Sequence, residues 1–414
     1  MLGAAAPGGG LIDPAAALPR FAYVGLDRQV HVAQPDGGER RQVTYAQVES
    51  PLMRWGGSSG GDACAWPTFS PQGDFMACFR STVVEGQSTP SDIRVAVLQV
   101  DGPEEVELDR IDEGLPLYAR WSPDGQALAV LVQADDQLEL RVCTRDQVGR
   151  HRVVDEGPPL FFGWLPDSRR LVLHAGGPSG SRLTVRDPLG SGEDVPLPGV
   201  PGTFCAPIVV GDRVVYAIQR GERSVVISAH PDGGDPVELF EAEGLLAFVP
   251  SPDGRWLAVS HAALDRGPYV GVSRVPLDGS GPAEQVAPEP CMAFFWLPGS
   301  DGLLTVGLDE ARKCLWWNLH LVESGDRRTI GPFRPTRELM FHLHFFEQFA
   351  GSHPLVSPDG RFLVYPSFEG ALAGPDAPPG RPRIEVVELG RPEMPAVAVA
   401  HGRYATFAPA TTRG

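Results

Sequence analysis

The sequence predicts an all-β protein folded as a single β-propeller. Three observations predict this: a turn phrase that recurs along the chain, apolar runs on both sides of each copy, and a high content of turn-forming residues. The 414 residues include 49 glycines and 42 prolines, while 42% of the chain is hydrophobic. A chain with that apolar content can bury a core, so the glycines and prolines indicate many tight turns rather than disorder.

The recurring phrase is an aromatic or apolar residue, then Ser-Pro-Asp-Gly or a degenerate form of it, then an apolar run. Successive copies are separated by about 41 to 60 residues, which is the spacing of a repeat architecture. The copies stand at 69–73, 121–125, 164–168, 209–212, 250–254, 296–299 and 356–360.

The chemistry of the phrase predicts a hairpin. Proline presets φ at the second turn position, aspartate binds its own backbone, and glycine tolerates a positive φ. A third alternating strand follows each hairpin, for example at 93–97 and 138–142, and a second turn leads to a short fourth strand. Four antiparallel strands joined by short turns are typical of one propeller blade.

The two ends of the chain complement each other. Residues 21–24, 30–32 and 41–44 supply three strands of a unit that lacks its innermost strand, and Tyr404–Pro409 resembles such a strand. We therefore expect the C-terminal strand to join the N-terminal blade, giving eight four-stranded blades. The alternative is seven blades, if the C-terminal strand lies outside the ring.

The predicted domain organisation follows from these repeats. Residues 1–20 form a flexible arm, 21–410 the propeller, and 411–414 a tail, with a short helical insertion near 337–350.

The net charge of −17 argues against nucleic acid as a partner and against attraction to anionic membranes. No stretch of 18 apolar residues predicts a membrane span, and no export signal is recognisable, so a cytoplasmic location is expected. The six cysteines have neither disulfide-framework nor zinc-ligand spacing, and we expect buried free thiols.

The Ser-Pro-Asp-Gly hairpins, with Trp or Phe directly before the serine, resemble the repeats of TolB-like propellers. They are also similar to the propeller domains of prolyl-oligopeptidase and dipeptidyl-peptidase relatives. The resemblance covers roughly residues 21–410 and implies the fold, with a role as a scaffold, binding platform or gate. It leaves no residues for the hydrolase domain of the peptidases.

Two motifs could carry chemistry, and both have a plainer interpretation. Residues 56–60 match Gly-x-Ser-x-Gly, but no strand precedes the serine and no helix follows it, so a loop between blades is favoured. His342 and His344, with Glu347 and His353 nearby, suggest a metal site. A helix there would direct His342 and His344 to nearly opposite sides, which disfavours the metal.

That helix is predicted over 337–350, with Thr336 as its N-cap and Gly351 at its end. Phe341 and Phe345 fall outside its main apolar stripe. It therefore either packs on the propeller or offers a surface to a partner or a second copy.

The tryptophans before the turns are predicted to be core residues between blades, whereas Trp55 in a Gly/Ser-rich loop lacks such an explanation. The tryptophans before the turns are Trp121, Trp164 and Trp296.

The sequence leads us to expect a non-catalytic scaffold that binds a protein partner, with contacts in the 52–64 loop and the 333–351 insertion. No catalytic residue, cofactor or metal is predicted. Two alternatives stay open: an accessory or gating subunit of a separate peptidase or transporter, and a propeller enzyme of the metal-dependent hydrolase or lactonase type. The candidate partner-binding residues are Trp55, Phe341, Phe345, His342 and His344.

Overall fold

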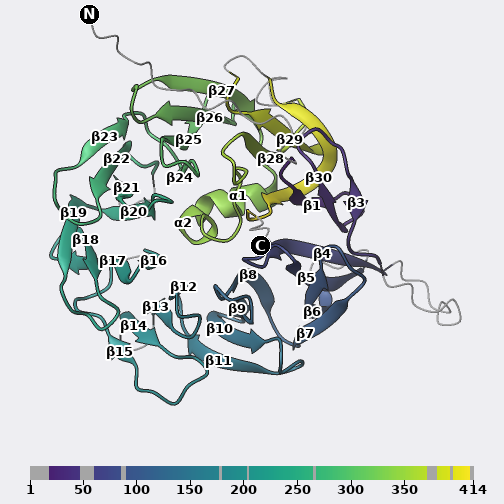
Figure 1. Ribbon diagram of the computed structural model, residues 1–414, viewed down its shortest axis with the longest axis horizontal. Coiled ribbons are helices and arrows are strands. Elements are labelled where there is room, and N and C mark those ends of the chain that lie inside the picture. Colours follow the sequence, from purple (N-terminus) through teal and green to yellow (C-terminus); the bar gives the residue numbers. More distant parts are fainter. Residues whose placement is uncertain are drawn as a thin grey trace, which may run out of the picture.

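The structure, a computed structural model, describes residues 18–46, 60–84, 90–176, 180–202, 205–263, 267–370, 380–391 and 395–410. These residues form a single all-β propeller in which the chain runs once around a ring (Figure 1). The first strand of each four-stranded blade lies nearest the centre of the ring (Figure 1).

Six blades are four-stranded antiparallel sheets whose strands follow chain order from the centre outward. The first three comprise β4 (Gly60–Phe69), β5 (Phe75–Val84), β6 (Ser91–Gln99) and β7 (Glu105–Ile111); β8 (Leu115–Trp121), β9 (Ala127–Ala134), β10 (Gln137–Thr144) and β11 (His151–Glu156); and β12 (Leu160–Trp164), β13 (Leu171–Ala175), β14 (Arg182–Arg186) and β15 (Val195–Pro196). The next three comprise β16 (Ile208–Val210), β17 (Arg213–Arg220), β18 (Arg223–Ala229) and β19 (Val237–Glu243); β20 (Leu245–Pro250), β21 (Trp256–Ala262), β22 (Val272–Pro276) and β23 (Glu284–Ala287); and β24 (Ala293–Trp296), β25 (Gly302–Asp309), β26 (Cys314–Leu321) and β27 (Arg327–Phe333).

The seventh sheet joins the two ends of the chain. It has six strands in the order β28, β29, β30, β1, β2, β3. Their bounds are β28 (Phe362–Phe368), β29 (Pro382–Glu388), β30 (Val397–Phe407), β1 (Phe21–Gly25), β2 (Val30–Ala33) and β3 (Arg41–Gln42).

The prediction of eight four-stranded blades is therefore wrong, and the described residues form seven blades. The physical reason is strand β30, which continues without interruption from one partner to the other. Its first half pairs with β29, where His401 faces Arg383, and its second half pairs with β1, where Phe407 faces Phe21. The last and first repeat units thus share one strand. The expected pairing of the C-terminal strand with the N-terminal strands is present.

The Ser-Pro-Asp-Gly phrase forms the turn that its chemistry predicts. At 251–254, the Gly254 N–H donates to the Ser251 carbonyl at 2.9 Å and Gly254 has φ of 68°. The Ser251 hydroxyl donates to Asp253 at 2.5 Å and accepts the Trp256 N–H at 2.9 Å, which fixes the start of the next strand. The same serine contacts recur at Ser122 and Ser357.

The tryptophan before each turn joins neighbouring blades. The indole N–H of Trp121 donates to the Thr68 carbonyl, that of Trp164 to the Arg120 carbonyl, and that of Trp296 to the Val249 carbonyl, at 3.0, 3.1 and 3.0 Å. All three tryptophans are buried, at 4%, 4% and 7% exposure, so the prediction that they are core residues is confirmed. The six cysteines are also buried and free, as expected.

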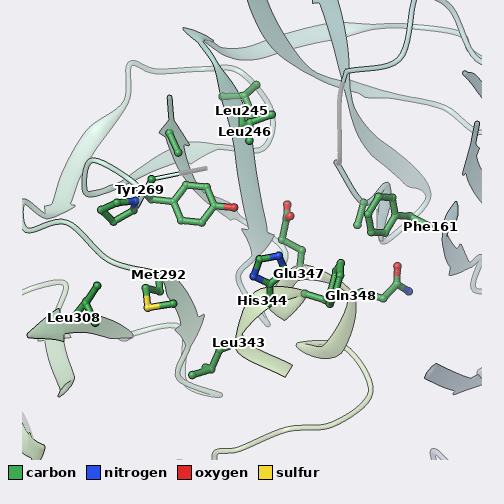
Figure 2. A pocket seen from close by; sticks show the side chains of 15 residues that line it. Phe161, Leu245, Leu246, Tyr269, Met292, Leu308, Leu343, His344, Glu347 and Gln348 are labelled. Carbon is green, nitrogen blue, oxygen red and sulfur yellow. The ribbon is translucent and has the colours of Figure 1, made fainter. Parts of the chain in front are cut away.

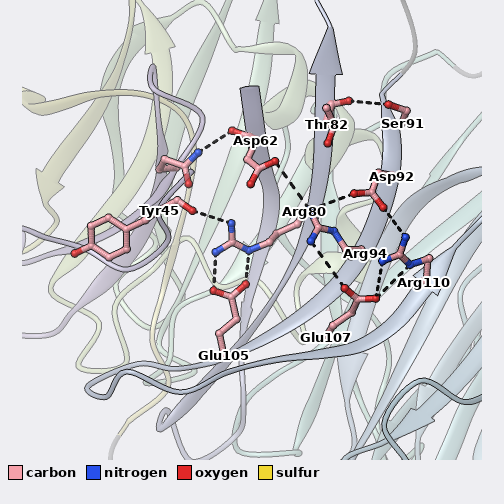
Figure 3. Close-up of polar contacts among 11 residues, drawn as sticks. Tyr45, Asp62, Arg80, Thr82, Ser91, Asp92, Arg94, Glu105, Glu107 and Arg110 are labelled. Carbon is pink, nitrogen blue, oxygen red and sulfur yellow. Dashed lines mark hydrogen bonds and ion pairs between the residues drawn. The ribbon is translucent and has the colours of Figure 1, made fainter. Parts of the chain in front are cut away.

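Charged residues form a ladder across the blade of β4 to β7 (Figure 3). Arg80 on β5 stands opposite Arg94 on β6, which stands opposite Arg110 on β7. Like charges directly opposite each other repel, and carboxylates between them offset this. Nε of Arg80 lies 2.5 Å from Oε1 of Glu105. Asp92 pairs with the other two arginines: its Oδ2 lies 3.4 Å from Nη2 of Arg94, and its Oδ1 lies 2.9 Å from Nη1 of Arg110.

Of the predicted N-terminal arm, the structure describes residues 18–20. Arg20 is tied to the propeller, because its Nη1 lies 2.7 Å from Asp101. Among the described helices, none combines the length and the apolar character that crossing a membrane requires.

Candidate functional site: the helical insertion in the ring

The insertion after β27 lies at the centre of the ring (Figure 1). It begins where predicted, because the Thr336 hydroxyl accepts the Leu339 N–H at 3.2 Å as an N-cap. The predicted single helix over 337–350 is instead two short helices, α1 (Arg337–His344) and α2 (Phe346–Phe349). They are separated at Phe345, whose φ of −116° and ψ of 33° interrupt the helix.

Apolar side chains anchor one side of the insertion to the ring. Leu339, Leu343 and Phe346 are 0%, 1% and 1% exposed. The centre of the Phe346 ring lies 4.8 Å from that of Phe294 and 5.8 Å from that of Phe295. Both of these residues lie on the inner strand β24. Leu339, Leu343 and Phe346 belong to the main apolar stripe predicted for this helix, and this stripe is the face that packs against the ring.

Trp66 anchors the other side. It lies in a bulge of β4 and has a φ of 52°. The centre of its ring lies 5.5 Å from that of the Phe341 ring and 5.2 Å from that of the Phe349 ring. It also contacts Tyr404 on β30 at 4.7 Å. Sequence reasoning did not identify Trp66, because it stands before a degenerate copy of the turn phrase and its contacts are distant in the chain.

Buried polar contacts complete the attachment. Each imidazole nitrogen of His353 has a hydroxyl partner at 2.8 Å, Nε2 with Thr68 and Nδ1 with Ser352. The Tyr118 hydroxyl donates to the Gln348 carbonyl at 2.8 Å. Burial, and to a lesser extent Arg120, lower the pKa of His353 to about 3, so this imidazole is neutral at physiological pH.

The two histidines suggested as metal ligands lie in different surroundings. His342 is fully buried and its Nδ1 lies 3.0 Å from the Tyr404 hydroxyl, whereas His344 is exposed. Burial and the neighbouring His353 lower the pKa of His342 well below its usual range. Within the described part of the chain, no three His, Cys, Asp or Glu side chains are grouped so as to hold a metal ion.

Of the other candidate partner-binding residues, the structure describes Phe341 and Phe345 but not Trp55. Phe341 and Phe345 are half-buried and their rings contact each other at 4.9 Å, so each keeps some accessible surface. Trp55 and residues 52–59 of the predicted 52–64 loop, with most of the Gly-x-Ser-x-Gly match, lie outside the described residues, whereas residues 60–64 belong to strand β4, so that part of the loop prediction is wrong. The role of these residues in binding a partner stays a prediction.

A cavity of about 270 Å³ lies beside the insertion (Figure 2). Its wall is mainly apolar and comes from blades distant in sequence, including Phe161, Leu246 and Met292. The carboxyl of Glu347 projects into it from α2, and the hydroxyl of Tyr269 points toward that carboxyl (Figure 2). His344 lies at the same cavity.

Glu347 is held by a backbone group across the channel. One carboxyl oxygen accepts the Phe248 N–H from β20 at 2.9 Å. Burial raises the pKa of Glu347 to about 8, although the Phe248 hydrogen bond opposes the shift. A carboxyl with this pKa is mostly protonated at neutral pH. It can ionise when a cation approaches.

A second, more polar cavity of about 770 Å³ opens at the edge of the ring formed by the Ser-Pro-Asp-Gly turns. Its wall includes Arg120, Arg213, Asp212 and Asp253, and Glu347 borders it as well. The insertion therefore separates two depressions, one apolar and one charged.

Comparison with known proteins supports the fold and does not assign a function. No family model and no curated protein matches the sequence. Among solved structures, a prolyl endopeptidase shares 13% identity with a TM-score of 0.55, covering 84% of this chain and 51% of that one. A eukaryotic initiation factor shares 11% identity with a TM-score of 0.54, covering 95% of this chain and 99% of that one.

TolB from Acinetobacter baumannii matches at 16% identity with a TM-score of 0.37, over 63% of this chain and 62% of TolB. The chain thus spans about three fifths of the TolB chain and half of the prolyl endopeptidase chain. At these identities the shared feature is the β-propeller.

Proposed function

We propose that this propeller is a non-catalytic scaffold that binds a partner protein through the edge of the ring where the inner strands begin. The observation that supports this is the distribution of exposed large apolar side chains. Exposed apolar residues that gather on one face are typical of interaction sites, whereas scattered ones are not.

The topology assigns each exposed residue to an edge. The inner and third strands begin at one edge of the ring, and the second and fourth strands end there. Among the described residues, seven exposed large apolar side chains lie at this edge. They are Leu26, Tyr45, Leu115, Val200, Val270, Leu308 and Met340, with exposures of 39%, 63%, 38%, 67%, 52%, 47% and 39%.

At or next to the opposite edge, the described residues include Val106, Val148, Leu189 and Val397, at 41%, 52%, 50% and 51% exposure, and Val153 lies within β11 at 42%. The insertion itself enters from the apolar edge, and Met340 projects from α1. The inner strand β4 also begins at this edge, at Gly60, which lies in the contact region predicted over 52–64. The apolar edge therefore includes the predicted insertion and the start of β4.

The test uses the full chain expressed at native level and purified with its partner, followed by crosslinking. A stoichiometric partner should crosslink to the apolar edge and be lost from the double variant Met340→Glu, Val200→Glu. The matched control Val148→Glu, Leu189→Glu adds the same charge at the opposite edge and should retain the partner. Retention in the first variant, or loss only in the control, contradicts the proposal.

The identity of the partner separates the alternatives. A peptidase or membrane transporter would support the accessory or gating role. Absence of any partner together with hydrolase activity of the purified chain would overturn the scaffold in favour of the enzyme.

A further inference from the structure

The cavity beside Glu347 has the composition of a small-ligand site. Most of its lining is apolar or aromatic, and a few polar groups converge on it, which is typical of such sites. At about 270 Å³ it suits a molecule of roughly ten non-hydrogen atoms.

Two polar atoms in this cavity lack protein partners among the described residues. The Phe248 N–H occupies one carboxyl oxygen of Glu347 and leaves the other facing the cavity. The Tyr269 hydroxyl is directed to the same space (Figure 2) and donates to no described group. Both side chains are half-buried, so these two convergent atoms are open to a ligand that enters the cavity.

The charge of that partner follows from the carboxyl. A buried carboxylate is costly unless a cation accompanies it. Among the described lining residues, His344 is the one basic side chain, and it is exposed. The rings of Tyr269, Phe161 and Phe345 border the cavity, and aromatic faces attract organic cations. The net charge of −17 adds a long-range attraction for cations.

We propose that this cavity binds a small primary ammonium ion that carries an apolar or aromatic group. The ammonium donates hydrogen bonds to the free oxygen of Glu347 and to the Tyr269 hydroxyl oxygen. The apolar group packs against Phe161, Leu246 and Met292. The cavity lies next to the docking edge of the proposed function, since Leu308 belongs to both, but the proposal does not rest on that function because a ligand of this size needs no partner protein.

Other titratable groups surround Glu347 and enter the design of the test. Cys205 precedes β16, Tyr269 precedes β22, and burial raises the pKa of both side chains, so both stay neutral. His344 lies on α1 at the cavity, and Arg120 on β8 borders the second cavity that also reaches Glu347. His344 is the neighbour to be removed in a control, because it is the one basic side chain among the described residues that line the cavity.

The experiment is calorimetric titration of the full chain with 2-phenylethylamine and, separately, with 2-phenylethanol, which has nearly the same shape without the charge. We expect the amine to bind the wild type at least tenfold more tightly than the alcohol. Glu347→Gln should weaken amine binding by tenfold or more while leaving alcohol binding within twofold. The glutamine side chain of this variant retains an oxygen for the Phe248 N–H, and circular dichroism checks that the variant is folded.

Glu338→Gln is the matched control, since it removes a carboxylate from α1 outside this cavity, and it should bind the amine like the wild type. Amine affinity should also rise with pH up to about 8, by up to tenfold per unit, because Glu347 must ionise to pair with the ammonium. The rise should persist in His344→Gln. Equal binding of amine and alcohol by the wild type, or unchanged amine binding by Glu347→Gln, overturns the proposal.

Discussion

His353 and Thr68 are 285 positions apart in the chain, yet Nε2 of the histidine lies 2.8 Å from the hydroxyl oxygen of the threonine. The contact is buried and joins the segment after α2 to the inner strand β4. The other imidazole nitrogen contacts the Ser352 hydroxyl, so both polar atoms of the neutral ring are paired. This pair fixes the insertion against the first four-stranded blade.

Replacing Thr68 by valine should destabilise the fold by about 1–3 kcal/mol, because a valine of similar shape leaves a buried imidazole nitrogen without a partner. Urea unfolding monitored by circular dichroism measures the change. Thr144→Val is the control at a half-buried threonine whose side chain contacts no described hydrogen-bond partner, and a change within about 0.5 kcal/mol is expected there. Equal losses in the two variants would show that the contact contributes little.

The buried histidines should make the protein sensitive to acid. Burial keeps the native pKa of His353 at about 3, whereas the unfolded chain takes up this proton near pH 6.5. The unfolded state therefore binds more protons between these values. The contribution of His353 to the free energy of unfolding should be constant above about pH 6.5 and fall below it by up to about 1.4 kcal/mol per pH unit.

Unfolding free energies at pH 7.5, 6 and 5 test this expectation. His353→Gln keeps a donor and an acceptor but cannot take up the proton, so its stability should fall less steeply than that of the wild type. Identical slopes for the two proteins would rule out His353 as a source of the acid sensitivity.

Glu347 should act in the opposite direction. Its native pKa of about 8 exceeds the value near 4.5 of the unfolded chain, so the native state binds more protons between these values. Its contribution to stability is complete below about pH 4.5 and is lost as the pH rises toward 8. Glu347→Gln should therefore be increasingly more stable than the wild type from pH 5 to 8, by an amount of order 1 kcal/mol or more at pH 8.

The difference in unfolding free energy between the Glu347→Gln variant and the wild type, measured at several pH values, isolates this effect from that of the histidines. A difference that does not change with pH would mean that Glu347 titrates as in the unfolded chain.

The charge ladder should contain one pair that contributes strongly to stability. Arg80 has a side-chain exposure of 3% and Glu105 of 32%, so Glu105→Gln leaves a buried guanidinium without its carboxylate. We expect a loss of about 1–3 kcal/mol, which 0.5 M salt should reduce only slightly.

The matched control for this variant is Glu238→Gln, whose partner Arg220 is 50% exposed. An exposed pair contributes at most about 1 kcal/mol. Thermal unfolding of both variants gives the comparison, and a larger loss at Glu238 would contradict the role of burial.

The architecture of a single blade was predictable from the amino-acid sequence. The Ser-Pro-Asp-Gly turn is built from contacts among residues at most five positions apart, such as those of Ser251 with Asp253 and Trp256. Local contacts of this kind can be predicted from a single sequence. The same holds for the alternation of apolar and polar residues that buries one side of each strand. The N-cap at Thr336 and the burial of Trp164 were predictable for the same reason.

The closure of the ring and the packing at its centre depend on contacts between residues that are distant in the sequence. The blade count depends on β30 pairing with both β29 and β1, a choice between partners that no local pattern encodes. The break at Phe345 and the contact of Trp66 with Phe349 arise only when the insertion enters the channel. The properties of Glu347 likewise depend on Phe248 and Tyr269, because burial by segments distant in sequence sets its pKa and shapes its cavity.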